Sequence, residues 1–508
     1  MVDYSHNTHP RKTTELNTSH THSTISDYQR NKQARKQSNI CIKMKDNPKK
    51  HSIDPSDDGP RCDQQEEKQK KKRKKKKIVV SASKKNESSL VKSRHLYESA
   101  KQKWLYPDED SDYEVEVKKS LRKSISALEN DNDNNTGTDD IKGEQDQEEK
   151  YSLLAQANDA LTLLCIQKSE YNPKEVFRLL RGGGYVARLS QDVLRYKLPS
   201  DVINSDQPKV QHSTTALACP CRLYDDALPK EDLNVLINAL CPEDSSYWKD
   251  HSYSVYPPTP YFSYAFDLKD DTLKKLGALG KYVQTIQRLS SNLPSKGRES
   301  KKRIPQYAEV WAHHRPHCSG HQLHFDSDNE GRGEVKHPLV SSILYLSEEG
   351  CGGPSLMTDQ RLGDTELAQN GWLAYPKRNR LVVFDGSVLH GVIPGRGYVG
   401  QRKRVTLMVA LWEDIRIREG DEPGAARPLP RVNQQTKSAP IPEWYDKLTL
   451  TTQDGKQKGK STNPTTEGLQ HVPDQVEPIR LGSVFTTSSG KQIKEGRMPH
   501  YDTVFQGF

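Results

Sequence analysis

Two segments far apart in the chain constrain the fold more than any other feature. GHQLHFDSD (320–328) places His324 two positions before Asp326, and RLVVFDGSVLHGVIPG (380–395) carries His390. Side chains at positions i and i+2 of a β-strand point to the same face of the sheet. An extended segment at 324–326 would therefore direct an imidazole and a carboxylate to one point. A distant strand that adds His390 completes the two-histidine, one-carboxylate set that binds Fe(II) and leaves coordination positions open.

The segments after Asp326 have the pattern of consecutive β-strands. SSILYLSEEGCGGPSLMT (341–358) predicts a strand, a glycine turn and another strand, and 376–392 predicts a polar turn, a buried strand and a short strand with His390. RVTLMVALW (404–412) alternates, with Arg404 and Thr406 on one face and Val405 and Leu407 on the other. Since no helical pattern interrupts the series, it predicts an all-β jelly roll, a double-stranded β-helix, inside a chain of overall α+β class.

Taken in order, these motifs resemble the 2-oxoglutarate/Fe(II)-dependent dioxygenases, in particular the prolyl 4-hydroxylase-like catalytic domain. That family has an aromatic strand before His-x-Asp, a Tyr-Leu strand before Gly-Gly, a distal His-Gly-Val-x-Pro and a basic residue on the last strand. The matching segments here are EVWAHHRPHCSGHQLHFD, ILYLSEEGCGG, LHGVIP and RKRVTLMVALW. The resemblance covers residues 300–415 and extends, less specifically, back to residue 215.

The resemblance implies a role for individual residues. The iron ligands would be His324, Asp326 and His390. The groups that bind the co-substrate 2-oxoglutarate would be Arg404, Tyr345 and Thr406. Ascorbate is a further cofactor that the resemblance implies.

Two neighbouring cations compete with Arg404 for the 2-oxoglutarate carboxylate. Arg402 shares its strand parity and Lys403 is adjacent to it. We expect Arg404 to lie deepest, because the apolar strand begins directly after it. Its planar guanidinium also suits bidentate pairing with a carboxylate.

The implied activity is hydroxylation of a protein side chain, with proline as one candidate. Two alternatives remain open at this point. The same chemistry could act on a small molecule or a nucleic acid, or the barrel could be a non-catalytic binding or scaffold module. Fold alone does not choose between them.

Histidine and cysteine clusters raise two further alternatives. The family carries a tyrosine ten positions before the first iron ligand, where this chain has His314. The surrounding group 313–321 is either a second metal site or a set of hydrogen-bonded side chains. Cys219, Cys221 and Cys241 would supply three zinc ligands but lack a fourth.

Residues 1–150 differ from the rest in composition. They are rich in Lys, Ser, Asn, Asp, Glu and Gln, and we expect them to be disordered because such a segment buries too little apolar surface. KQKKKRKKKK (68–77) predicts either a nuclear address or a nucleic-acid contact through phosphates. No stretch approaches the about 18 consecutive apolar residues of a membrane span, so we expect no membrane partner and a nuclear or cytoplasmic protein.

The remaining boundaries follow from periodicity. Residues 151–214 have apolar residues at helical spacing and predict a helical segment. Residues 215–415 form the expected dioxygenase domain, with supporting helices before its core strands. Residues 416–508 are a polar, Pro-rich tail whose aromatic residues suggest partial docking on that domain.

Overall fold

The computed structural model describes residues 88–108, 112–130, 141–168, 172–198, 219–291, 293, 303–328, 335–397, 399–418, 426–430, 441–450, 471–487 and 504–506. All of them belong to the second of two compact units, residues 72–508. The basic run 68–77, and the disorder expected for residues 1–87, lie outside the described residues.

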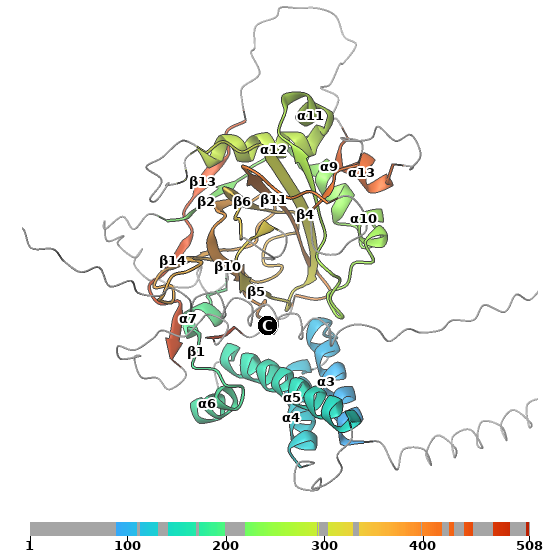
Figure 1. Cartoon of the computed structure of the whole chain (residues 1–508), viewed down its shortest axis with the longest axis vertical. Helices are drawn as coiled ribbons and strands as arrows, with labels where there is room; N and C mark the ends of the chain where they lie inside the picture. Colours follow the sequence, from blue (N-terminus) through green and yellow to red (C-terminus); the bar gives the residue numbers. More distant parts are fainter. Residues whose placement is uncertain are drawn as a thin grey trace, which may run out of the picture. The chain divides into compact units, whose positions relative to one another are not determined.

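The larger sheet has eight strands, and all its pairings are antiparallel except that of β12 with β3. In spatial order these are β12 (Ala426–Pro428), β3 (Ser263–Asp267), β4 (Tyr307–Pro316), β11 (Lys403–Trp412), β6 (Val340–Tyr345), β9 (Leu381–Asp385), β2 (Cys221–Asp225) and β13 (Asp474–Val476). β4 and β11, the third and fourth strands in this order, form its longest pairing (Figure 1).

The smaller sheet has five strands, all antiparallel. They are β14 (Ile479–Leu481), β8 (Gly371–Ala374), β7 (Ser355–Arg361), β10 (Val388–Val392) and β5 (His321–His324). Apolar side chains of the two sheets meet in one buried cluster, which includes Met408 and Trp412 from β11 and Met357 and Trp372 from the smaller sheet. The described chain thus has mixed α and β content with two facing, largely antiparallel sheets.

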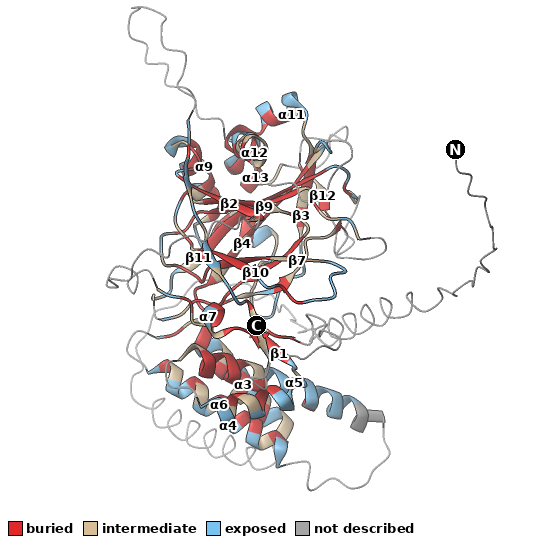
Figure 2. Cartoon of the chain, turned by 90° about the vertical axis from the view of Figure 1, so that its left-hand side faces the viewer, coloured by how far each residue is buried: buried red, intermediate tan, exposed pale blue. Residues whose placement is uncertain are grey.

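Helices cover the outer face of the larger sheet: α9 (Lys230–Leu240), α10 (Ser246–Asp250), α11 (Asp270–Lys275), α12 (Gly277–Ser290) and α13 (Glu443–Leu448). The odd-numbered face of β11, with Val405, Leu407, Val409 and Leu411, packs against this layer. Arg404 and the even-numbered residues after it therefore face the space between the sheets, as the alternation predicts. Figure 2 shows the buried residues concentrated in the strands and on the inner sides of these helices.

A second helical layer lies against the smaller sheet. It consists of α3 (Ser89–Leu105), α4 (Tyr113–Glu129), α5 (Ile141–Gln167), α6 (Pro173–Gly182) and α7 (Gln191–Leu194). Their apolar side chains share a cluster with Leu323, Leu356, Leu389 and Ile393 of the sheet region. β1 (Ala187–Leu189), between α6 and α7, is the middle strand of a small sheet with β15 (Phe485–Thr487) and β16 (Val504–Phe505).

The expectation of disorder up to residue 150 is wrong for α3, α4 and the start of α5. Tyr97 and Trp104 of α3 are buried, as are Val117, Leu121 and Leu128 of α4. These residues recur at intervals of four or seven and so form one apolar stripe on each helix. The intervening lysines, serines and glutamates lower the average hydropathy without interrupting the stripe, which is why a compositional argument missed it.

The core strands and most helices lie where the sequence predicts them. β6, β7, β9, β10 and β11 match their expected segments, and α6 begins at Pro173 and ends beside Gly183, as its sequence indicates. The apolar pattern of 272–290 predicts one long helix, but the structure divides this segment at Gly277 into α11 and α12. That residue has a positive φ of 50°, and a Cβ there would lie 2.4 Å from the carbonyl oxygen of Thr449.

The tail after residue 415 contributes to both sheets. β13 pairs with β2 of the larger sheet, and β14 pairs with β8 of the smaller one. Trp444 and Tyr445 of α13 are buried in the helical layer. Among the described helices, none combines the length and apolar character needed to cross a bilayer.

Candidate metal centre

The structure brings His324, Asp326 and His390 together between the two sheets. One donor atom from each lies within 4.8 Å of the others. The Nε2 atoms of His324 and His390 lie 3.5 Å and 3.6 Å from Asp326 Oδ1. β5 and β10 are antiparallel neighbours in which His324 and His390 are direct partners, so sheet pairing joins residues that are distant in the sequence. β5 ends at His324, and Asp326 follows in the loop.

Each of the three side chains has one polar atom held by the protein. Nδ1 of His324 lies 2.8 Å from the Gln322 carbonyl, and Nδ1 of His390 lies 3.0 Å from that of Val388. A proton on each Nδ1 leaves Nε2 with a free lone pair directed at the centre. Ser341 Oγ donates to Asp326 Oδ2 at 2.6 Å, which leaves Oδ1 available.

His390 and Asp326 have the protonation states that metal binding requires. Burial lowers the pKa of His390 to about 4, although Asp326 opposes this shift. Burial alone would raise the pKa of Asp326, but His390, His324 and Ser341 together hold it well below its usual value. A neutral imidazole and an ionised carboxylate are the forms that act as ligands, and both prevail at neutral pH.

A buried arginine lies beside polar side chains on the inner face of the larger sheet. Arg404 is 3% exposed, its guanidinium lies 5.3 Å from the ring centre of Tyr345, and its Nη2 donates to Ser355 Oγ at 3.2 Å. The Tyr345 hydroxyl lies 2.8 Å from the same Ser355 oxygen. Thr406 follows Arg404 on the same strand face and is also buried. These three predicted residues therefore lie together.

The residues fit an iron ion and a dicarboxylate co-substrate. Two imidazoles and one carboxylate are the donor set of non-haem Fe(II) oxygenases. Arg404 Nε and Thr406 Oγ1 are buried without a hydrogen-bond partner, and Arg404 has no carboxylate partner among the described residues. Buried donors and charges of this kind are costly unless a ligand satisfies them. A bound carboxylate would supply the missing acceptor.

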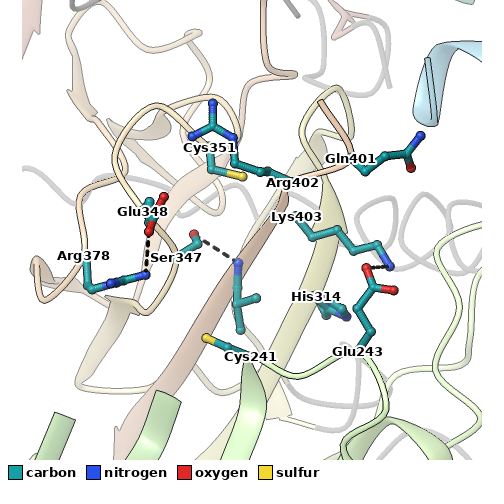
Figure 3. A pocket seen from close by; sticks show the side chains of 11 residues that line it. Cys241, Glu243, His314, Ser347, Glu348, Cys351, Arg378, Gln401, Arg402 and Lys403 are labelled. Carbon is teal, nitrogen blue, oxygen red and sulfur yellow. Dashed lines mark hydrogen bonds and ion pairs between the residues drawn. The ribbon is translucent and has the colours of Figure 1, made fainter. Parts of the chain in front are cut away.

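The two cations that compete with Arg404 lie elsewhere. Arg402 is exposed and donates to the Val399 carbonyl at 2.9 Å. Lys403 has the opposite strand parity and pairs with Glu243 at 2.8 Å. Lys403 therefore lines a different cavity, of about 250 Å³, on the helix side of the larger sheet (Figure 3).

His314 lines that same outer cavity and does not face the metal centre. Its ring stacks on Trp248 with centroids 5.2 Å apart. Burial and then Lys403 lower its pKa to about 4. His313, with the opposite parity, faces the space between the sheets instead. His314 therefore lies on the face of β4 that points away from the metal centre, and it does not take the place of the family's tyrosine there.

The other histidine and cysteine alternatives are resolved by local contacts. His317 Nδ1 accepts from the Gly352 amide at 2.8 Å, and its Nε2 lies 3.0 Å from the Arg396 carbonyl. This histidine is hydrogen-bonded on both nitrogens. Within the described part of the chain, only the His324 group offers three clustered metal donors, so the cysteine residues considered for zinc do not form such a site.

Sequence reasoning missed two residues beside the centre. Arg315 of β4 is the direct cross-strand partner of Arg404. Gln506, near the end of the chain, accepts at Oε1 from the Leu323 amide at 2.6 Å and so supports the strand that carries His324. In the sequence, only strand parity places Arg315 on the inner face of β4, since it shares that parity with Trp311 and His313. Nothing in the sequence indicates the Gln506 contact.

Together these features define a chain with two facing sheets and a two-histidine, one-carboxylate centre. No protein-family model matches the sequence, and no curated protein matches it. A Pseudomonas putida prolyl-4-hydroxylase is 18% identical, over 39% of this chain and 86% of that one, with a TM-score of 0.23. A Burkholderia pseudomallei oxidoreductase of the 2OG-Fe(II) oxygenase family is 15% identical, over 26% and 51%, with a TM-score of 0.16.

A third similar structure is HygX from Streptomyces hygroscopicus with nickel and 2-oxoglutarate bound. It is 9% identical, over 40% of this chain and 86% of that one, with a TM-score of 0.22. The first two structures carry the name of the family that the sequence motifs resemble. Similarity at this level does not assign an activity.

Proposed function

We propose that this chain is an Fe(II)- and 2-oxoglutarate-dependent dioxygenase that hydroxylates a protein side chain, with proline as the first candidate. One observation carries the proposal: a complete ligand set lies beside a buried arginine whose guanidinium lacks a carboxylate partner among the described residues. A buried arginine that served only the stability of the fold would have a counterion within the protein, because an uncompensated buried charge destabilises the folded state.

The proposed architecture is a double-stranded β-helix. It is supported by the alternation of β6, β7, β9, β10 and β11 between the two facing sheets and by the position of the ligands on β5, on β10 and in the loop after β5. The centre would then lie at an open end of the barrel, with Asp326 and His390 largely buried and His324 partly exposed.

Each residue has a distinct task in this proposal. His324, Asp326 and His390 would hold Fe(II), with Ser341 and the backbone carbonyls fixing their orientation. Arg404 and Thr406 would bind the distal carboxylate of 2-oxoglutarate. When bound, iron and 2-oxoglutarate supply the O2 activation that hydroxylates a C–H bond. Ascorbate, a protein partner and a nuclear or cytoplasmic location remain predictions.

The test is an anaerobic titration of the full chain with Fe(II) and 2-oxoglutarate, followed by the metal-to-ligand charge-transfer band. We expect the band in the wild type and its loss in His390→Ala. Arg404→Ala should weaken 2-oxoglutarate binding about 30-fold or more, since it removes a buried charge partner. The matched control is Arg402→Ala, which removes an exposed arginine two positions away and should leave the band unchanged.

A wild-type protein that is folded but shows no band would refute the proposal. Equal effects of Arg402→Ala and Arg404→Ala would refute the assignment of the carboxylate site. Turnover of 2-oxoglutarate to succinate that persists in His390→Ala would show that the metal is held elsewhere.

A further inference from the structure

A second arginine faces the metal centre, and the proposed co-substrate does not account for it. Arg315 lies opposite Arg404 in the β4–β11 pairing, with its side chain half-buried and its Nε buried without a hydrogen-bond partner. Like Arg404, it has no carboxylate partner among the described residues. Two adjacent guanidinium groups facing one space without counterions are unfavourable unless anions bind there.

The two arginines reach in different directions. Arg404 contacts Ser355 and Tyr345, on the side of β6 and β7. Arg315 Nη1 donates to the Gly320 carbonyl at 3.0 Å and lies 3.5 Å from Ser319 Oγ, in the turn between β4 and β5. One carboxylate bound by Arg404 would therefore leave Arg315 without a carboxylate partner among the described residues.

Arg315 approaches the proposed metal ligands through the turn before β5. Its Nη1 donates to the Gly320 carbonyl, and Gly320 directly precedes His321, the first residue of β5. The His321 ring stacks on His324 with centroids 4.7 Å apart. The His321 ring therefore connects the Arg315 contact at Gly320 with a proposed metal ligand, so a group bound by Arg315 would lie near the metal centre.

The charges of the proposed complex also leave Arg315 without a counterion. In the proposed complex, Fe(II) and the 2-oxoglutarate dianion neutralise each other, and Asp326 offsets Arg404. Glu309, which interacts with Asp326, is held by hydrogen bonds from its own donors, so Arg315 is left as a cation without a carboxylate partner among the described residues. The Tyr253 hydroxyl is hydrogen-bonded to it and is neutral at physiological pH, because burial raises the pKa of Tyr253.

We propose that Arg315 binds an anionic group of the primary substrate, so that the enzyme prefers a target residue flanked by Asp or Glu. This inference rests on the proposed function and names its substrate class. It also gives the pair of arginines a division of roles, with Arg404 for the co-substrate and Arg315 for the substrate.

The experiment measures peptide binding to the full chain loaded with Mn(II) and N-oxalylglycine, which replace the reactive metal and co-substrate. The probes are a fluorescent peptide with a central proline flanked by Asp and Glu, and its matched peptide with Asn and Gln. We expect the wild type to prefer the acidic peptide about ten-fold or more, as one charge-assisted contact allows. Arg315→Gln should abolish this preference.

Two controls separate recognition from structure. Ser319→Ala removes a contact of Arg315 within the turn and keeps its charge, so the preference should remain. Arg315→Lys keeps the charge without the planar fork and should retain part of the preference. Loss of the preference in Ser319→Ala would instead assign Arg315 to holding the turn and overturn the proposal.

The charge-transfer titration with Fe(II) and 2-oxoglutarate distinguishes the two proposals. Arg315→Gln should keep the band and the 2-oxoglutarate affinity of the wild type. A loss of affinity as large as that of Arg404→Ala would make Arg315 a co-substrate ligand and overturn the inference. A normal wild-type band with equal binding of both peptides, or with binding of neither, would overturn the inference alone, whereas absence of the band would overturn the proposed function.

Discussion

Glu309 gives the chain a buried acid whose ionisation should be visible in stability. It lies on β4, is 6% exposed and accepts hydrogen bonds from Tyr261 Oη at 3.0 Å, Ser263 Oγ at 2.6 Å and Trp412 Nε1 at 3.1 Å. Burial raises its pKa from 4.5 to about 7, against the opposing effect of these donors. The carboxylate is therefore less favourable in the folded protein than in the unfolded chain.

The sign and size of the effect follow from proton linkage. Because the folded pKa is higher, the protonated group stabilises the fold fully below pH 4.5, and this contribution is lost as the pH rises through 7. Between about pH 5 and about pH 8 the loss amounts to about 2.5 kcal/mol of unfolding free energy. Glu309→Gln does not ionise, so the difference between wild type and variant should shift by that amount over this range.

Urea unfolding followed by tryptophan fluorescence, at pH values across this range, measures that difference. The metal-free full chain is used for both proteins, so that titration of the metal ligands is common to them and cancels. Glu231→Gln, at an exposed position of α9, is the matched control and should run parallel to the wild type. A Glu309→Gln curve that also runs parallel to the wild type would refute the claim that burial perturbs this acid.

Two further substitutions test the packing around the centre and in the N-terminal helices. A Cβ on Gly352, at φ 85°, would lie 2.4 Å from Arg404 Cδ, so Gly352→Ala should weaken 2-oxoglutarate binding about ten-fold or more. Gly363→Ala, at φ 92° with open space around it, is the control for backbone strain. Equal affinities for 2-oxoglutarate in the two variants would contradict the prediction. Leu121→Ala should lower the free energy of unfolding by about 2–5 kcal/mol in urea titrations, because Leu121 is 1% exposed. Val115→Ala on the same helix, at a 58% exposed position, should change it little, and similar losses in both would mean that this helix does not pack.

The strands that carry the candidate site were predictable because their signals are local. The alternation of 404–412 separates Arg404 and Thr406 from Val405 and Leu407, and the structure places these two sets on opposite faces of β11. The glycine turns before Ser355 and after Asp385 likewise define where strands end. Sequence therefore predicts which face of a strand each side chain occupies, and this is enough to bring a histidine and an aspartate two positions apart to one point.

Composition was a poorer guide than periodicity. Residues 113–129 contain many charged and polar side chains, yet Val117, Leu121 and Leu128 form a continuous buried stripe. A helix of this kind is stable only when its stripe is covered, which here requires α3 and α5. Its stability thus depends in part on α5, which continues to Gln167, so a window that ends at residue 150 does not include all of its packing partners.

The position of Arg315 beside Arg404 could not be predicted from the sequence, because it depends on strand pairing. The sequence predicts that Arg315 and Arg404 each face one side of a strand, but their adjacency depends on the register between β4 and β11. Register arises from the whole sheet, since a slip by one residue would exchange the inner and outer faces of the strand. Here the inner set includes Trp311 and His313 and the outer set Ala312 and His314. The register that buries the apolar alanines and valines against the helices also sets two arginines side by side, so the cationic character of the centre follows from packing elsewhere in the sheet.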